Sequence, residues 1–161
     1  MHVRVWGRDG SLQRAGADGH ALAASQRDLF AESDVLSLHL RLADATRGIV
    51  RAADLAAMRP GAVLVNTSRA ALIEDGALER ALRAGSPAWA AVDVFDQEPL
   101  RDTQHPLLQL ANVVCTPHIG YVTRDEYELQ FADIFQQIVA FADGTPINVV
   151  NPTVLAAAGR R

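Results

Sequence analysis

Short apolar runs alternate with segments of helical periodicity along almost the whole 161-residue chain. Short apolar runs suit buried strands, whereas apolar positions that recur every three or four residues suit helices. Regular alternation of the two is typical of parallel βα units rather than of a β-sandwich or a helical bundle. The sequence therefore predicts an α/β fold, with strands over residues 3–6, 20–23, 35–40, 62–65, 89–94 and 112–115.

Helix signals lie between these runs. Ser25, with Asp28 three residues later, resembles a capping box that opens a helix. Residues 75–84 place their apolar side chains on one helical face, and Gly85 suits the position after the helix end. Because residues 35–40 are almost all apolar, we expect this strand to be buried on both faces. Further helices are predicted over residues 11–15 and 52–58, and a long amphipathic one over residues 124–142.

The composition indicates a soluble cytoplasmic protein. The chain is 49% hydrophobic and 21% charged, which suits one globular domain, expected over residues 1–152 with a flexible tail at 153–161. A net charge of -4 gives no basic surface for nucleic acid or anionic lipid. No stretch approaches the roughly 18 apolar residues of a membrane span. The N-terminus has no secretory signal, and a single cysteine suits a reducing compartment.

Three polar side chains follow three of the predicted strands: Arg69, Glu98 and His118. The carboxyl ends of parallel strands are where open α/β sheets bind ligands. A guanidinium, a carboxylate and an imidazole together suit acid–base chemistry on an oxo acid. Each also has a structural alternative, since the histidine and the acid can be ordinary loop residues and Arg69 can pair with Glu74 or Asp75. No metal ligand is predicted.

Cys115 lies three residues before His118, so a cysteine–histidine nucleophile pair is one interpretation. Its apolar surroundings favour the other, a buried strand residue, because free cysteine usually behaves as a small core side chain. The chain contains no lysine, which excludes Schiff-base and lysine general-base mechanisms.

The chain carries an ordered set of short segments, at residues 32–35, 38–40, 46–48, 58–62, 65–69, 93–95, 98–99, 105–107, 116–120 and 148–152. This set resembles the C-terminal half of the D-isomer-specific 2-hydroxyacid dehydrogenases, the family of D-3-phosphoglycerate dehydrogenases and glyoxylate/hydroxypyruvate reductases. The resemblance implies a Rossmann-like doubly wound parallel sheet. It also implies an oxidoreductase that passes a hydride between NAD(P)H and a small 2-oxo or 2-hydroxy acid.

By this resemblance, Arg69 binds the substrate carboxylate and the C2 oxygen, His118 is the general acid and base, and Glu98 orients the imidazole. These roles make physical sense. An arginine fork matches a carboxylate with two parallel hydrogen bonds. A carboxylate beside an imidazole favours its protonated form, the form that can donate a proton.

The resemblance also implies a dinucleotide cofactor. Asp93 has the alternative of capping the loop that follows it. At the end of the first strand, Arg8 can pair with a 2′-phosphate, which favours NADP, whereas the adjacent Asp9 can bind the ribose of NAD. The implied cofactor contacts are Arg8, Leu40, Thr67, Ser68, Arg69, Asp93, His118 and Gly120.

The chain departs from the family pattern at its start. It has no Gly-x-Gly-x-x-Gly turn, and the strand that leads into that turn is missing. That strand would lie between the strands at residues 3–6 and 35–40, so we expect the isolated chain to be poorly stable and to have little or no activity. The alternatives are a non-catalytic NAD(P)-binding or interaction module and an inactive truncated remnant. Relatives are typically dimers, so a homodimer is one expected assembly.

Overall fold

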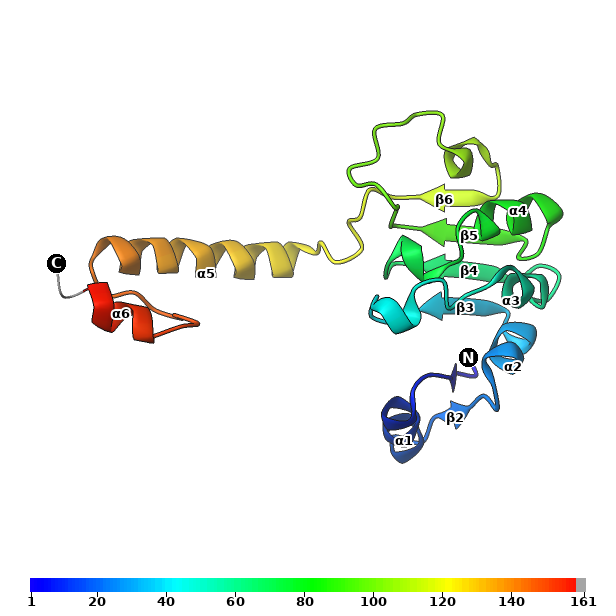
Figure 1. Cartoon of the computed structure of the whole chain (residues 1–161), viewed down its shortest axis with the longest axis horizontal. Helices are drawn as coiled ribbons and strands as arrows, with labels where there is room; N and C mark the ends of the chain where they lie inside the picture. The colour runs from blue at the N-terminus through cyan, green and yellow to red at the C-terminus, as the bar shows by residue number, and fades with distance from the viewer. Residues whose placement is uncertain (159–161) are drawn as a thin grey trace. The chain divides into compact units, whose positions relative to one another are not determined.

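The structure is a computed structural model, which describes residues 1–158. Its contacts divide the chain after Gly120 into two compact units. The first unit contains two parallel sheets and their connecting helices (Figure 1). The second contains helix α5 (Arg124–Ala142) and helix α6 (Thr153–Ala158). The predicted domain of residues 1–152 includes parts of both units, and it stays a prediction that they act as one domain.

The larger sheet contains four parallel strands in the order β3, β4, β5, β6 (Figure 1). Their last rows are in register, because Leu38 pairs with Asn66, Asn66 with Val92, and Val92 with Cys115. The carboxyl ends of all four strands therefore lie at one edge of the sheet, which confirms the predicted α/β class. The strands are β3 (Val35–Leu38), β4 (Val63–Asn66), β5 (Trp89–Val92) and β6 (Val113–Cys115).

The connecting helices begin and end at the predicted signals. Ser25 Oγ accepts a hydrogen bond from the Asp28 N–H at 3.1 Å and caps the first turn of α2. Helix α4 ends at Gly85, whose φ of 83° is the left-handed conformation that glycine adopts without strain. The helices of this sheet are α2 (Gln26–Glu32), α3 (Ala52–Ala56) and α4 (Ala77–Ala84), with short 3-10 turns η1 (Asp44–Thr46), η2 (Ala70–Leu72) and η3 (Pro106–Gln109).

The smaller sheet pairs β1 (Arg4–Val5) with β2 (Ala21–Leu22), and α1 (Asp9–Ala17) connects the two strands. It is separate from the larger sheet, so β1 and β3 are not hydrogen-bonded to each other. An ion pair between Arg4 and Glu32 links β1 to the end of α2. The strands on either side of the expected gap thus belong to different sheets.

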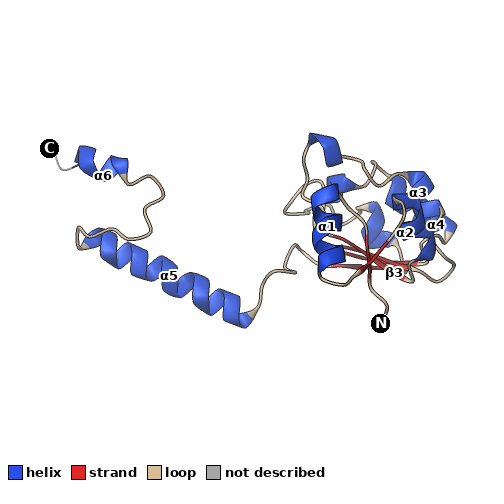
Figure 2. Cartoon of the chain, turned by 90° about the horizontal axis from the view of Figure 1, so that it is seen from below, coloured by secondary structure: helices blue, strands red, loops and turns tan. Residues whose placement is uncertain are grey.

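The core lies on one side of the larger sheet. Leu55 of α3, Leu64 of β4 and Leu72 of η2 are fully buried there. Figure 2 shows α2, α3 and α4 on the same side of this sheet. A large apolar cluster packs in this layer, so burial of these side chains is the main favourable contribution to folding of the first unit.

The expectation that residues 35–40 are buried on both faces was wrong. The strand ends at Leu38, and Val35 is 63% exposed while Leu36 is 3% exposed. The reason is that the helices of the first unit cover one face only, so alternate side chains point to the other face. Trp89 and Val114 lie on that same face and are also more than half exposed.

Helix α5 is amphipathic in sequence, but none of its residues is buried. Tyr127 and Phe131 stack with ring centroids 4.3 Å apart along one side of the helix. Helix α6 occupies most of the segment predicted as a tail; residues 159–161 lie outside the described part of the chain, and the tail's flexibility stays a prediction. Among residues 1–158, no helix is long and apolar enough to cross a membrane.

We expect Leu64→Ala to lower the free energy of unfolding by about 2–5 kcal/mol, because it leaves a cavity at a fully buried position. Val114→Ala is the matched control, since its side chain is 65% exposed and its loss should cost about 0.5 kcal/mol or less. Urea denaturation of the two variants checks this. Equal losses of unfolding free energy in the two variants would contradict the assignment of Leu64 to the core and of Val114 to the exposed face.

Candidate active site

Three loops leave the larger sheet at neighbouring strand ends. Residues 67–69 follow β4, residues 93–98 follow β5 and residues 116–120 follow β6. Because β4, β5 and β6 are parallel neighbours, their loops meet at the same edge of the sheet. Tertiary structure therefore brings together segments that are far apart in the sequence.

His118 and Glu98 form a close pair at this edge. The distance between His118 Nδ1 and Glu98 Oε2 is 2.6 Å, and the two side chains are 31% and 34% exposed. The other carboxylate oxygen, Oε1, accepts the Phe95 N–H at 2.8 Å. Glu98 is thus held by its own turn while it contacts the imidazole.

The surroundings of Glu98 keep it ionised. The hydrogen bond from the Phe95 N–H and then that from His118 lower the pKa of Glu98, and burial opposes them more weakly. The positive charges of His118 and Arg69 lower this pKa further. An ionised carboxylate can only accept hydrogen bonds, so the proton in the Glu98–His118 bond belongs to Nδ1 of the ring.

Arg69 ends the loop after β4 and directly precedes the turn η2. Its side chain is exposed, and Nη1 donates to the Ser68 carbonyl oxygen at 2.6 Å. Its charge lowers the pKa of Glu98, so it belongs to the same electrostatic neighbourhood as the Glu98–His118 pair. The three residues predicted for acid–base chemistry are therefore gathered at one edge.

Asp93 is buried at the end of β5, with 3% of its surface exposed. It accepts hydrogen bonds from the Thr116 hydroxyl and from the Ile119 and Gly120 N–H groups, the last two at 2.9 and 2.8 Å. Burial alone would raise the pKa of Asp93, but these hydrogen bonds and the nearby His118 together lower it. The carboxylate thus binds the loop after β6 rather than the loop that follows Asp93, and its role as a cofactor contact stays a prediction.

Two other predicted cofactor contacts bind each other. Ser68 Oγ donates to the Leu40 carbonyl oxygen at 2.7 Å, which ties the end of β4 to the segment after β3. Asn66 supports this turn, because its side chain accepts the Ser68 N–H and donates to the Arg69 carbonyl oxygen at 3.1 and 3.0 Å. Asn66 is 1% exposed, and the sequence analysis missed its part in the site. The sequence signal that could have identified Asn66 is a polar residue at the end of an apolar strand.

The remaining predicted residues differ in position. Thr67 is exposed and lies beside Gly120, where a built Cβ on the glycine would be 3.7 Å from the threonine methyl group. Arg8 directly precedes α1, and within residues 1–158 it makes no hydrogen bond or ion pair with the other candidates. Burial raises the pKa of the Cys115 thiol, so less of it is present as the reactive thiolate. This disfavours the nucleophile interpretation.

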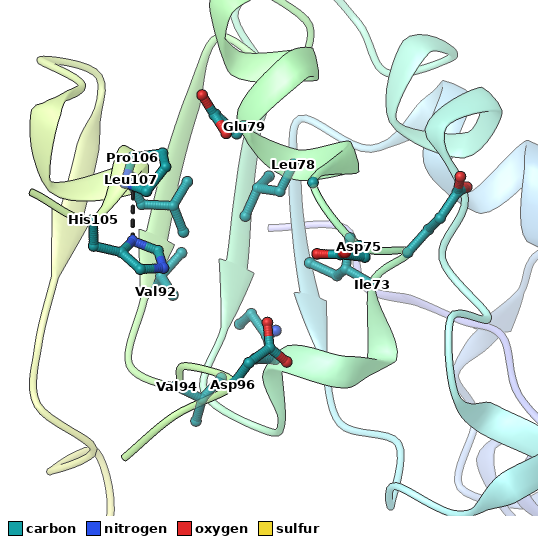
Figure 3. Close-up of a pocket in the computed structure, with 14 residues that line it drawn as sticks. Ile73, Asp75, Leu78, Glu79, Val92, Val94, Asp96, His105, Pro106 and Leu107 are labelled. Atoms are coloured by element: carbon teal, nitrogen blue, oxygen red, sulfur yellow. Dashed lines mark hydrogen bonds between the residues drawn. The ribbon is translucent and has the colours of Figure 1, made fainter. Parts of the chain in front are cut away.

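A cavity of about 170 Å³ opens next to this edge, between the start of α4, strand β5 and η3 (Figure 3). Apolar side chains such as Val92 and Leu107 line it, and His105 and Asp96 also face it. None of Arg69, Glu98 and His118 lines this cavity, so it is separate from the acid–base cluster.

A parallel sheet with polar loops at its carboxyl edge is the arrangement in which open α/β proteins bind ligands. The chain belongs to the family of D-isomer specific 2-hydroxyacid dehydrogenases and matches its NAD binding domain over residues 1–120. The resemblance inferred from the sequence segments is thereby confirmed.

Similar proteins include several enzymes of this family. The glyoxylate reductase of Aeropyrum pernix is 45% identical over 132 residues, which are 81% of this chain and 39% of that protein. The structure of a putative D-3-phosphoglycerate dehydrogenase from Ralstonia solanacearum is 52% identical with a TM-score of 0.86, and covers 100% of this chain and 47% of that one. A D-isomer specific 2-hydroxyacid dehydrogenase from Xanthobacter autotrophicus Py2, solved with NADPH and MES, is 31% identical with a TM-score of 0.61 over 84% of this chain and 57% of that one. The chain thus spans about two-fifths of the length of the curated relatives it matches.

Folding lowers the pKa of Glu98 below the ordinary glutamate pKa of 4.5, so the ionised side chain stabilises the folded state. This stabilisation is present above pH 4.5 and is lost as pH falls through the lower folded-state pKa. We expect Glu98→Gln to be less stable than the wild type at neutral pH, with the difference narrowing below pH 4.5. Urea denaturation at a series of pH values checks this. Gln97→Ala, an uncharged change in the same turn, should show no such pH-dependent difference, and a constant difference for Glu98→Gln would contradict the pairing.

Proposed function

We propose that this chain is the cofactor-binding and proton-transfer part of an oxidoreductase that passes a hydride between NAD(P)H and a small 2-oxo or 2-hydroxy acid. The observation that carries the proposal is the Glu98–His118 contact of 2.6 Å beside Arg69, at the carboxyl edge of a parallel sheet. Membership of the dehydrogenase family supports the same reaction class.

In this mechanism, His118 moves the proton. Glu98 is ionised and accepts from Nδ1, so the ring tautomer is set and Nε2 is the atom that exchanges a proton with the substrate oxygen. During reduction, the protonated ring donates to the carbonyl oxygen, and Glu98 stabilises the positive charge of the ring. During oxidation of a 2-hydroxy acid, the neutral ring accepts the hydroxyl proton.

Arg69 binds and polarises the acid. One N–H of its guanidinium donates to the Ser68 carbonyl oxygen, and a guanidinium has four further N–H groups for a substrate. A planar fork can hold the substrate carboxylate and reach the C2 oxygen beside it, which draws electrons from the carbonyl carbon that receives the hydride.

A bound nicotinamide would supply or accept the hydride, since no side chain does so. The residues at the edge fit such a group: Thr67 offers an exposed hydroxyl, and the turn held by Asn66 presents Ser68 and the Leu40 carbonyl side by side. Arg8, at the end of β1, would bind a 2′-phosphate, so NADPH is the preferred cofactor in this proposal.

The first test compares the chain alone with a chimera in which it replaces the matching part of the Aeropyrum pernix relative. We expect turnover of glyoxylate or hydroxypyruvate with NAD(P)H by the chimera and little or none by the chain alone. His118→Gln in the chimera should lower kcat by about 10²–10⁴-fold, because it removes the proton donor. His20→Gln is the control, at an exposed position directly before β2. An active chimera that tolerates His118→Gln would contradict the proposed role, whereas turnover by the chain alone would overturn the expected inactivity.

Cofactor choice is tested on the chain by fluorescence titration with NADPH and NADH. We expect Arg8→Ala to weaken NADPH binding by about tenfold, the size of one charge-assisted hydrogen bond, and to leave NADH binding unchanged. Arg14→Ala removes an arginine from α1 that contacts Ser11 and serves as the matched control. Equal weakening of both cofactors by Arg8→Ala would contradict phosphate recognition.

A further inference from the structure

The buried carboxylate of Asp93 is enclosed by the loop that carries His118. Its Oδ1 accepts from the Thr116 hydroxyl and the Ile119 N–H, and its Oδ2 accepts from the Gly120 N–H. All three donors belong to residues 116–120, the segment that follows β6. Asp93 is therefore the main polar anchor of this loop within the described residues.

The backbone of His118 explains how two successive N–H groups reach one carboxylate. His118 has a φ of 58°, the left-handed conformation that non-glycine residues rarely adopt. A left-handed residue turns the N–H groups that follow it toward the same side and forms a concave site for an anion. Here the anion is the Asp93 carboxylate, so Asp93 and the unusual backbone of His118 support each other.

Gly120 is required by this close approach rather than by its own backbone angle. Its φ is not in the left-handed range, yet a Cβ built on it would lie 2.9 Å from Asp93 Oδ2 and 3.6 Å from its Cγ. Asp93 is buried and tied by three hydrogen bonds, so it cannot move aside at low cost. The absence of a side chain at 120 thus lets the loop close on the carboxylate.

We propose that Asp93 is a positioning residue that holds the His118 backbone in its left-handed conformation, so that the imidazole stays against Glu98. The segment after β5 then holds His118 in two ways: Asp93 binds the N–H groups of the two residues that follow it, and Glu98 binds its ring. This inference rests on the proposed function for its catalytic meaning, but the contact network stands without it. It differs from the cofactor-ligand role that the family resemblance implies for Asp93.

The test follows the hydrogen-bonded imidazole N–H proton of His118 by NMR in the 15N-labelled chain. The resonance is assigned by its loss in His118→Gln and Glu98→Gln. We expect Asp93→Asn to abolish or shift it, because the amide places an N–H donor against one of the loop donors. Gly120→Ala should have the same effect by pushing the loop away from Asp93 Oδ2, and Thr116→Val should give a smaller shift because one donor is lost. Asp96→Asn, an exposed acid in the same turn, should leave the resonance at its wild-type position.

Circular dichroism melts of each variant separate loss of the contact from loss of the fold. If Asp93→Asn does not fold, Gly120→Ala and Thr116→Val decide the question. A wild-type chain without the resonance, or folded Asp93→Asn and Gly120→Ala chains that keep it unchanged, would overturn the proposal. A folded Asp93→Asn chain that keeps the resonance but binds NADH more weakly would support the cofactor-ligand role instead. None of these readouts needs turnover, so they test the positioning role of Asp93 even if the proposed reaction fails. Failure of one proposal can therefore be told apart from failure of the other.

Discussion

Parallel pairing of β4, β5 and β6 is the constraint on which the candidate site depends. Asn66, Val92 and Cys115 lie in one row across these strands, and the loops that follow them start from the same edge. A one-residue shift of any strand would turn its side chains to the opposite face and carry its loop away from the others. The buried row that includes Leu64 and Ala90 prevents such a shift, because it would place core side chains on the uncovered face.

At this edge, hydrogen bonds to the Glu98 and Asp93 carboxylates organise the site more than ion pairing does. The Glu98 and His118 side chains are each about one-third exposed, and water weakens a pair of this kind. Glu98 is kept in place by the Phe95 N–H, and the loop of His118 by the buried Asp93. Backbone donors thus orient the acid and the loop, and the imidazole is positioned between them.

The exposed face of the larger sheet is the least usual feature of the fold. Parallel sheets are normally covered on both faces, but Val35, Trp89 and Val114 are open on this one. Helix α5 in the second unit also has no buried residue. The family relatives are more than twice as long as the matched part.

The sequence by itself determined the order of strands and helices, the caps at Ser25 and Gly85, and the presence of Arg69, Glu98 and His118 at strand ends, because apolar periodicity and capping residues act locally. Only the tertiary structure decided which groups meet. The contacts of Asp93 with Ile119 and Gly120 join residues more than twenty positions apart. The Ser68–Leu40 hydrogen bond likewise joins the segments that follow β4 and β3. Burial of the strand at residues 35–40 was mispredicted for the same reason: whether a strand face is covered depends on where other elements pack, and local sequence does not contain that information.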